Sequence, residues 1–176
     1  KTLHKLMMTS QAYQMSSSMN EAGFAKDSDN DLFWRFDVRR LSAEEVRDSL
    51  LAVNGSLNPK LYGASFYEKL PQEVLARQSV PGKGWGTSSE EDRNRRSIYI
   101  HVKRSLLTPM LSVFDFPDTD HSCEARFTTL QPGQALFLLN SEFVHTQAKR
   151  LATRINQMID GSARQKLTAA FELVYA

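Results

Sequence analysis

The spacing of apolar residues along the chain predicts a mainly α-helical fold. In five stretches, apolar side chains recur every three or four residues, as they do along one face of an α-helix. These stretches cover residues 1–16, 43–54, 132–139, 144–158 and 167–174. Because the first and last stretches reach the two ends of the chain, we expect the chain to be a fragment of a longer protein.

The clearest helix start lies at Ser42. Ser42 and Glu45 are spaced as a capping box, in which each side chain bonds the backbone N–H of the other residue. Gly55 stands where helices often end in a left-handed conformation. The sequence therefore predicts a helix over residues 43–54, with Val46, Leu50 and Val53 on one apolar face.

A different pattern, with period two, predicts a small β element around residues 97–103. Ile98, Ile100 and Val102 should point to one side of a strand and the polar residues between them to the other. One strand cannot form a sheet alone, so we expect it to pair with a segment within residues 60–68 or with a part of the parent protein.

Residues 58–96 lack a sustained pattern and predict a long loop-rich excursion within a single domain of residues 1–176. Glycines and prolines interrupt the segment repeatedly. A short helix from Pro71 to about Arg77 is the exception, because proline suits the first turn of a helix. A chain of 176 residues has the length of one domain.

Composition excludes several classes of function. Lys and Arg number 22 and Asp and Glu 20, which gives a formal net charge of +2. A general nucleic-acid binder carries a stronger basic excess, so we expect no nucleic-acid partner. No apolar run approaches the ~18 residues of a transmembrane helix, so we expect no membrane span.

The acidic loop "DFPDTDHSCEAR", residues 115–126, gathers side chains that serve as acids, bases or metal ligands in proteins. The candidate catalytic residues are Asp115, Asp118, His121, Cys123 and Arg126, with Asp120 and Glu124 between them. Their spacing matches no metal-ligand set, and we expect no metal. Alternatively, the loop is a structural corner tied by an Asp115–Arg126 ion pair. Asp118 and Asp120 would then form turns.

The single cysteine, Cys123, could act as a nucleophile with His121 or His145 as its base. A lone cysteine near apolar segments is more often buried and unreactive, and we favour that interpretation. The sequence contains no Cys-x-x-Cys-His motif, so this chain cannot attach a c-type haem covalently.

A basic stretch around the predicted strand is a second candidate site. Its candidate anion-binding residues are Arg95, Arg96, Lys103 and Arg104, interleaved with Tyr99 and His101. Such a cluster can hold phosphate, sulfate or an acidic glycan, so an anionic ligand is one expected partner. Alternatively, the charges keep the edge of a strand solvated and unpaired.

The N-terminal patterns favour structural roles. Three aspartates at alternate positions in residues 27–31 are spaced like a calcium loop, but Leu32 stands where an EF-hand requires glycine. We expect Asp29 or Asn30 to cap a short helix instead. That helix would carry into the core the side chains of Leu32, Phe33 and Trp34. Four methionines should pack in the core rather than ligate haem or copper, namely Met7, Met8, Met15 and Met19.

Several long motifs together resemble one known family. They are "KTLHKLMMTSQAYQMSS", "DNDLFWRFDVRRLSAEEVRDSLLAVNGSL", the whole of residues 95–144, and "QAKRLATRI". The chain is similar to a planctomycete-type PSD domain, the carboxy-terminal domain of large exported proteins that often also carry a haem c segment. The resemblance implies a planctomycete or related bacterium, a periplasmic or cell-envelope location, and haem c elsewhere in the parent. It implies no reaction.

Together these observations favour a non-catalytic structural or interaction module of an exported multidomain bacterial protein. Its partners would be other domains of the parent, and this chain would bind no cofactor. The alternative is a cell-envelope enzyme, directed at polysaccharide, with its site at residues 115–126. An enzyme requires a pocket that receives this loop and converging groups from elsewhere, whereas a scaffold requires the loop carboxylates to be paired.

Overall fold

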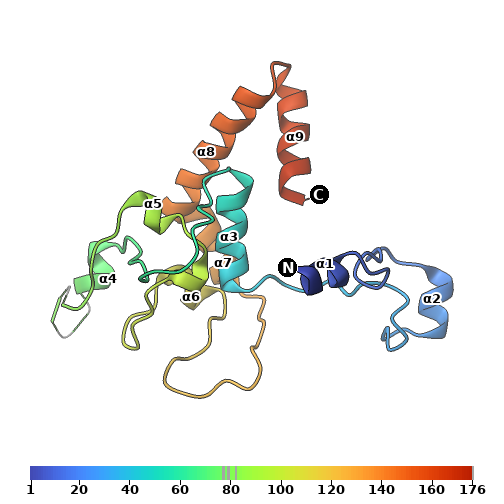
Figure 1. Cartoon of the computed structure of the whole chain (residues 1–176), viewed down its shortest axis with the longest axis horizontal. Helices are drawn as coiled ribbons and strands as arrows, with labels where there is room; N and C mark the ends of the chain where they lie inside the picture. The colour runs from blue at the N-terminus through green and yellow to red at the C-terminus, as the bar shows by residue number, and fades with distance from the viewer. Residues whose placement is uncertain (77, 79, 82, 176) are drawn as a thin grey trace. The chain divides into compact units, whose positions relative to one another are not determined.

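The computed structural model describes residues 1–175 except 77, 79 and 82. It divides into two compact units, Lys1–Arg40 (unit 1) and Leu41–Ala176 (unit 2), and each is described by itself (Figure 1). The described residues are mainly helical, which confirms the predicted fold class. That the whole chain behaves as a single domain stays a prediction.

Unit 1 holds two short helices, α1 (Thr2–Met8) and α2 (Glu21–Lys26). Asn20 begins α2, where its side-chain oxygen accepts a hydrogen bond from the backbone N–H of Gly23 (3.3 Å). The Trp34 ring lies across Gly23 so closely that a Cβ on this residue would approach the ring to 2.5 Å. Glycine at this position therefore allows the indole to pack on α2.

The segment after α2 is a turn and not the predicted helix. The Asp27 carboxylate accepts hydrogen bonds from the backbone N–H groups of Asp31 (3.0 Å) and Leu32 (2.7 Å). Because Asp27 satisfies these N–H groups within the loop, no helix begins at Asp29 or Asn30. The predicted burial of Leu32 and Phe33 is also wrong, since both side chains are exposed.

The first helix is shorter than predicted. The apolar pattern extends over residues 1–16, but α1 ends at Met8. The hydroxyl of Thr9 donates to the backbone oxygen of Lys5 (2.8 Å), and this local bond competes with continuation of the helix.

The methionines of unit 1 do not form a core. Met7, Met8 and Met19 are each more than half exposed, so their predicted core packing is wrong. Within unit 1, whose residues are all described, Asn30 is the one buried residue. Helical spacing alone therefore identified an apolar face in this unit but not what covers it.

Unit 2 is built around α3 (Ala43–Val53), which contacts η1 (Ser97–Tyr99), α6 (Pro109–Val113) and α8 (Glu142–Met158). Four segments contribute to its buried apolar cluster, which consists of Ala43, Phe66, Ile100 and Leu111. The core therefore depends on contacts between segments far apart in the sequence.

The start and end of α3 confirm the sequence prediction. The backbone N–H of Glu45 donates to Ser42 Oγ (3.3 Å), and the backbone N–H of Ser42 donates to Glu45 Oε2 (2.8 Å), which completes the capping box. After the helix, Gly55 adopts a φ of +80°, in the left-handed region that glycine favours.

The predicted strand over residues 97–103 is reduced to bridges. Its first part is the 3₁₀ helix η1, and Ile98 is exposed while Ile100 is buried. The predicted partner segment is confirmed at one point, because Phe66 pairs with Ile100 in a parallel bridge. A longer ladder does not form, since the backbone N–H of Ser97 donates to the Asp48 carboxylate instead (2.8 Å).

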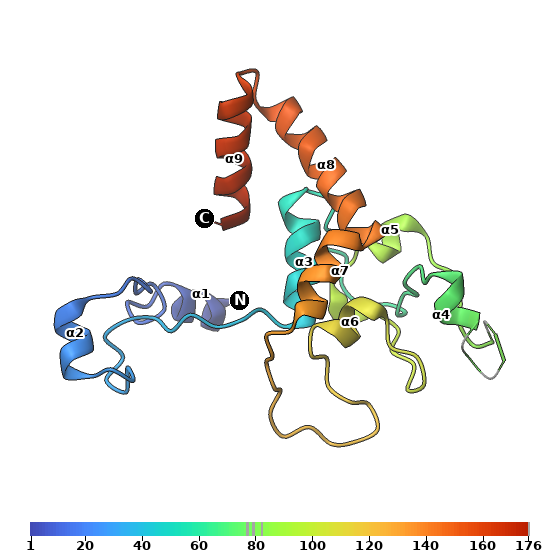
Figure 2. The same cartoon turned by 180° about the vertical axis from the view of Figure 1, so that it is seen from behind.

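The C-terminal half follows the predicted helices closely. The chain forms α7 (Pro132–Asn140), α8 and α9 (Ala163–Tyr175), and Figure 2 shows α9 turning back beside α8. The loop-rich segment contains α4 (Gln72–Ala76) and α5 (Glu90–Arg93). Helix α4 matches the helix predicted from Pro71, whose predicted end at Arg77 lies outside the described residues. No helix among the described residues is long and apolar enough to cross a membrane.

Candidate functional site

The acidic loop lies between α6 and α7 and extends away from the helices of unit 2 in both views (Figures 1 and 2). Every residue from Asp120 to Thr128 is exposed. Solvent therefore reaches this part of the loop along its whole length.

Asp115 closes the base of the loop. Its carboxylate accepts hydrogen bonds from the backbone N–H (2.8 Å) and the hydroxyl (2.7 Å) of Thr129, and from the side-chain amide of Gln134 (3.4 Å). Gln134 is buried and also donates to the backbone oxygen of Val113 (3.2 Å). Asp115 has a φ of 59°, so the chain turns sharply here. The base of the loop is thus a tight turn held by Thr129 and Gln134, and the interpretation that the loop has no chemical role stays a prediction.

The predicted tie between Asp115 and Arg126 is wrong, because each has a different partner. Arg126 donates to Glu44 Oε2 (2.8 Å), in the first turn of α3. Partial burial alone would raise the pKa of Glu44, but the hydrogen bonds from Arg126 and from backbone N–H outweigh it and lower that pKa. The Glu44 hydrogen bond in turn raises the pKa of Arg126.

The remaining carboxylates of the loop are engaged locally. Asp118 accepts the backbone N–H of Asp120 (2.9 Å) and contacts His121 Nδ1 (2.9 Å), and these two interactions, in that order, lower the pKa of Asp118. Asp120 forms an ion pair with Arg104. The hydrogen bond from the backbone N–H of Asp120 to Asp118 is the turn that the sequence predicted for this aspartate.

Cys123 is exposed, and the prediction that it is buried is wrong. Its Sγ contacts the backbone oxygen of Ala125 (3.1 Å). Both histidines proposed as its base are engaged elsewhere, His121 with Asp118 and His145 with the backbone oxygen of Leu139 (2.8 Å). Among the described residues, no group of three His, Cys, Asp or Glu side chains could hold a metal ion.

The four basic candidates do not converge on one ligand position. Arg95 is buried, lies over the Tyr99 ring (4.0 Å to the centroid) and donates to the backbone oxygen of Ala64 (2.9 Å). Lys103 donates to the backbone oxygen of Lys83 (2.8 Å), while Arg104 binds Asp120. Arg96 is exposed. Without the predicted strand, the spacing that would have aligned these side chains is lost.

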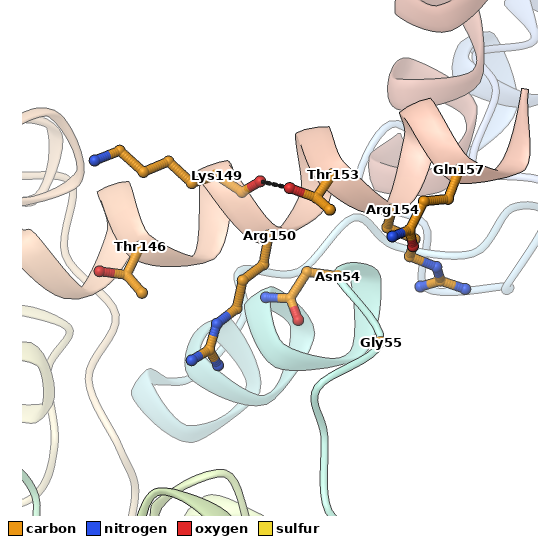
Figure 3. A pocket seen from close by; sticks show the side chains of 8 residues that line it. All are labelled: Asn54, Gly55, Thr146, Lys149, Arg150, Thr153, Arg154 and Gln157. Carbon is orange, nitrogen blue, oxygen red and sulfur yellow. Dashed lines mark hydrogen bonds between the residues drawn. The ribbon is translucent and has the colours of Figure 1, made fainter.

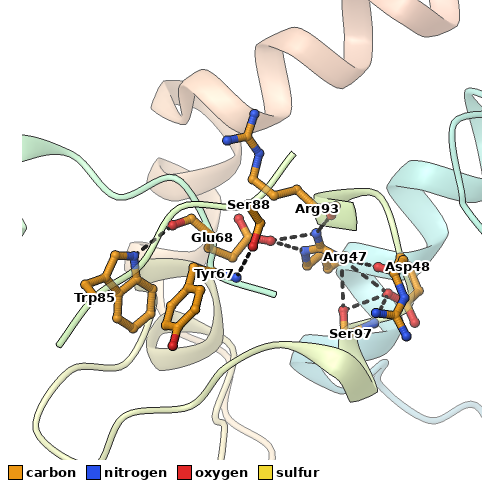
Figure 4. A network of polar contacts seen from close by, with 9 residues as sticks. Arg47, Asp48, Tyr67, Glu68, Trp85, Ser88, Arg93 and Ser97 are labelled. Atoms are coloured by element: carbon orange, nitrogen blue, oxygen red, sulfur yellow. Dashed lines mark hydrogen bonds and ion pairs between the residues drawn. The ribbon is translucent and has the colours of Figure 1, made fainter. Parts of the chain in front are cut away.

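Unit 2 has a charged centre that the sequence patterns did not predict, drawn in Figure 4. Arg47 is 2% exposed and donates through Nε (2.7 Å) and Nη2 (2.6 Å) to Glu68 Oε1. It also donates to the backbone oxygens of Arg93 and Arg95. The sequence held one indication that Arg47 is buried, because Arg47 lies four residues from both Ala43 and Leu51 and therefore on the same face of α3.

Trp85 packs beside this centre. Its Nε1 donates to the backbone oxygen of Glu68 (3.0 Å), and its ring meets the Tyr67 ring edge to face at 5.5 Å. The ring of His101 lies 4.4 Å from that of Tyr67. The aromatic group thus fastens the loop around Trp85 to the segment that carries Glu68.

A hollow of about 610 Å³ lies between the C-terminal end of α3 and α8 (Figure 3). Its lining is polar and basic and includes Asn54, Gly55, Lys149, Arg150, Arg154 and Gln157. No residue of the acidic loop lines it, so the loop and the hollow are separate features.

Comparison with known proteins gives one match. The whole chain, residues 1–176, matches the model of the family PSD1, described as a protein of unknown function (DUF1553). The chain belongs to this family. No curated protein and no solved structure matches the chain.

A second hollow of this PSD1 domain, of about 260 Å³, lies between α8 and α9. Its lining is mainly apolar, with Ile155, Met158, Ile159, Ala169 and Leu173 beside a single carboxylate, Glu172. A lining of this kind favours apolar contact and offers no set of groups for acid–base catalysis. Neither of the two hollows receives the acidic loop.

Proposed function

We propose that this PSD1 domain is a non-catalytic interaction module that holds other domains of an exported, multidomain bacterial protein. The observation that carries the proposal is the amount of apolar side chain left on the surface of the helices. Large exposed apolar patches usually mark sites where proteins associate.

The clearest such surface is α9, none of whose described residues is buried. Its large apolar side chains recur at helical spacing and are 45–62% exposed at Leu167, Phe171 and Val174. In unit 1, Leu3, Leu6 and Met7 repeat the pattern on α1 and are each at least 53% exposed. A helix of this kind gains most of its stability from packing its apolar face, so both helices favour a partner.

The arrangement of the acidic loop supports a non-catalytic role. Asp115, Asp118 and Asp120 each have a partner within the chain, and the loop lines neither hollow. Catalytic groups must converge on one position from which water can be excluded. The alternative of an envelope enzyme directed at polysaccharide, with its site at residues 115–126, has less support for this reason.

The cellular setting is part of the proposal and rests on the family resemblance. We place the parent protein in the periplasm or cell envelope of a planctomycete or related bacterium. Any haem c would belong to another segment of the parent, because the chain has one cysteine and no Cys-x-x-Cys-His motif.

Hydrogen exchange measured by mass spectrometry tests this role. We expect backbone amides of α1 and α9 to exchange at least about tenfold more slowly in the full parent protein than in this chain alone. Amides of α3, which already pack in the core, serve as the internal control and should exchange equally in both.

A matched pair of variants then links the protection to the apolar face. Phe171→Glu should abolish the slowing at α9, whereas Lys166→Glu, a polar change on the same helix, should leave it intact. Equal exchange of α9 in the chain and in the parent would contradict the proposal.

A further inference from the structure

We propose that the hollow between α3 and α8 is a binding site for a multivalent oxyanion, phosphate or sulfate, either free or carried on a larger molecule. This inference does not depend on the docking role, since every residue involved belongs to unit 2 and none lies on α9. Three features of the hollow favour an anion: its local positive charge, the covered carbonyl groups at the end of α3, and the N–H groups of Arg154 that remain for a ligand.

The lining of the hollow concentrates positive charge. Helix α8 carries Lys149, Arg150 and Arg154 against a single acidic residue, Glu142, in its first turn. This excess equals the formal net charge of the entire chain, which is +2. Figure 3 shows Arg150 and Arg154 extending from α8 toward the end of α3, with Gln157 beside Arg154.

The C-terminal end of a helix ordinarily repels anions, because its last carbonyl groups are unpaired. At α3 these groups are covered. Asn54 Nδ2 donates to the oxygen of Leu50 (2.8 Å), and Arg154 Nη1 donates to the oxygens of Ala52 (3.3 Å) and Val53 (2.6 Å). A ligand in the hollow therefore meets N–H groups of Arg154 and not bare carbonyl oxygens.

Arg154 is held in a position from which it can bind a second group. Its described hydrogen bonds all use Nη1, which leaves the N–H groups of Nε and Nη2 for a ligand. The guanidinium lies against Gly55, where a Cβ would come within 3.4 Å of Nη1. Gly55 also has a φ of +80°, which a residue with a side chain rarely adopts. Glycine at position 55 therefore leaves room for the guanidinium of Arg154.

The carboxylate of Glu90, at the start of α5, competes with the anion for Arg150, because the two side chains form an ion pair. The two side chains are 32% and 62% exposed, and exposed pairs of this kind contribute little to stability. A phosphate or sulfate carries more charge and binds arginine through two parallel hydrogen bonds, so it can take the place of Glu90. Removing the Glu90 carboxylate should therefore strengthen binding.

The test is a calorimetric titration of the chain with sodium phosphate and with sodium sulfate, in sodium chloride that keeps the ionic strength constant. We expect Arg150→Gln to weaken anion binding about tenfold, because one charge-assisted hydrogen-bonding partner is lost. We expect Glu90→Gln to strengthen binding about threefold or more, because the carboxylate that competes for Arg150 is removed. Lys166→Gln removes one positive charge on α9, outside the hollow, and should leave binding unchanged. Thermal melts of all three variants show whether each remains folded.

Two sources of the anion are distinguished in the same experiment by adding a sugar phosphate such as glucose 6-phosphate. Tighter binding of the ester than of inorganic phosphate identifies a carried group, and equal binding identifies the free ion. Either result supports the site if Glu90→Gln strengthens binding. The inference is overturned if no anion binds the folded chain at millimolar concentration. It is also overturned if Lys166→Gln weakens binding as much as Arg150→Gln, because nonspecific attraction to the positive charge of the chain would then account for the binding.

Discussion

Two arginines of unit 2, Arg47 and Arg126, each bind a glutamate, but they do so in very different surroundings. The side chain of Arg47 is 2% exposed and that of its partner Glu68 is 16% exposed. The side chain of Arg126 is 46% exposed and that of its partner Glu44 is 22% exposed. The residue types are the same, so the difference between the pairs comes from burial.

This difference decides what each pair contributes. A buried charge that loses its partner has no water to replace it, so removal of one member is strongly destabilising. An exposed arginine exchanges its glutamate for water at little cost in free energy. The centre at Arg47 therefore holds distant segments together, whereas the pair at Arg126 only fastens a loop to the start of α3.

The buried centre at Arg47 should contribute most to the stability of the fold. We expect Arg47→Met to lower the free energy of unfolding by about 3–5 kcal/mol, because the Glu68 carboxylate and two backbone oxygens lose their donor. Changing Glu68→Gln as well should lower it by less than the sum of the two single effects. Denaturant melts measure all three. The control is Arg96→Met, which changes an exposed arginine and should stay within about 0.5 kcal/mol of the original chain.

A smaller effect is expected at the base of the acidic loop. Asp115→Asn retains a residue that tolerates the positive φ but removes the charge that receives three hydrogen bonds, two from Thr129 and one from Gln134. We expect a loss of about 2 kcal/mol in denaturant melts, in the range for hydrogen bonds to a charged group. The matched change Asp118→Asn, in the exposed part of the loop, should have almost no effect. Equal effects of the two changes would contradict the corner at Asp115.

The cap of α3 should contribute less again. Ser42→Ala removes the oxygen that accepts the Glu45 N–H, and we expect a loss of about 1 kcal/mol. In a chain of this size the loss corresponds to a fall of roughly 2–4 °C in the melting temperature. Ser49→Ala, an exposed change within the same helix, is the control and should not lower the melting temperature.

The helices were predictable because their signals are local. The capping box at Ser42 and Pro132 at the first turn of α7 each act within a few residues of the helix that they begin. The same local reasoning predicted the turn at Asp118, whose carboxylate accepts the backbone N–H of Asp120.

The buried side of α3 was not predictable from the same signals. The apolar pattern pointed to Val46, Leu50 and Val53, but the buried residues are Ala43, Arg47 and Leu51. Arg47 can be buried only because Glu68 and backbone oxygens near residue 95 satisfy it, and these lie more than 20 residues away in the sequence. A local pattern counts arginine as a surface residue and carries no information about such partners.

The partners of Asp115 and Arg126 were missed for the same reason. Nearness in sequence suggested that they bind each other, but Arg126 binds Glu44, 82 positions away. The predicted strand failed similarly, since a bond from Ser97 to Asp48 replaced the ladder that its alternating residues favoured. What remained hidden in each case was a contact between distant segments.

The exposed pair of Arg126 and Glu44 should contribute least to stability, and its contribution should depend on pH. Because the pKa of Glu44 is lower in the folded chain than its ordinary value near 4.5, the pair with Arg126 stabilises the fold above that value, and this contribution is lost as the pH falls through the lowered pKa. We expect Arg126→Gln to lower stability at pH 7 by less than about 1 kcal/mol, as for other exposed pairs. At pH 3 the difference from the original chain should shrink. Melts at the two pH values measure it, with Arg96→Gln as the control for the lost charge. A deficit at pH 7 as large as that of Arg47→Met would show that the loop is held as firmly as the core and would remove the distinction between the two pairs.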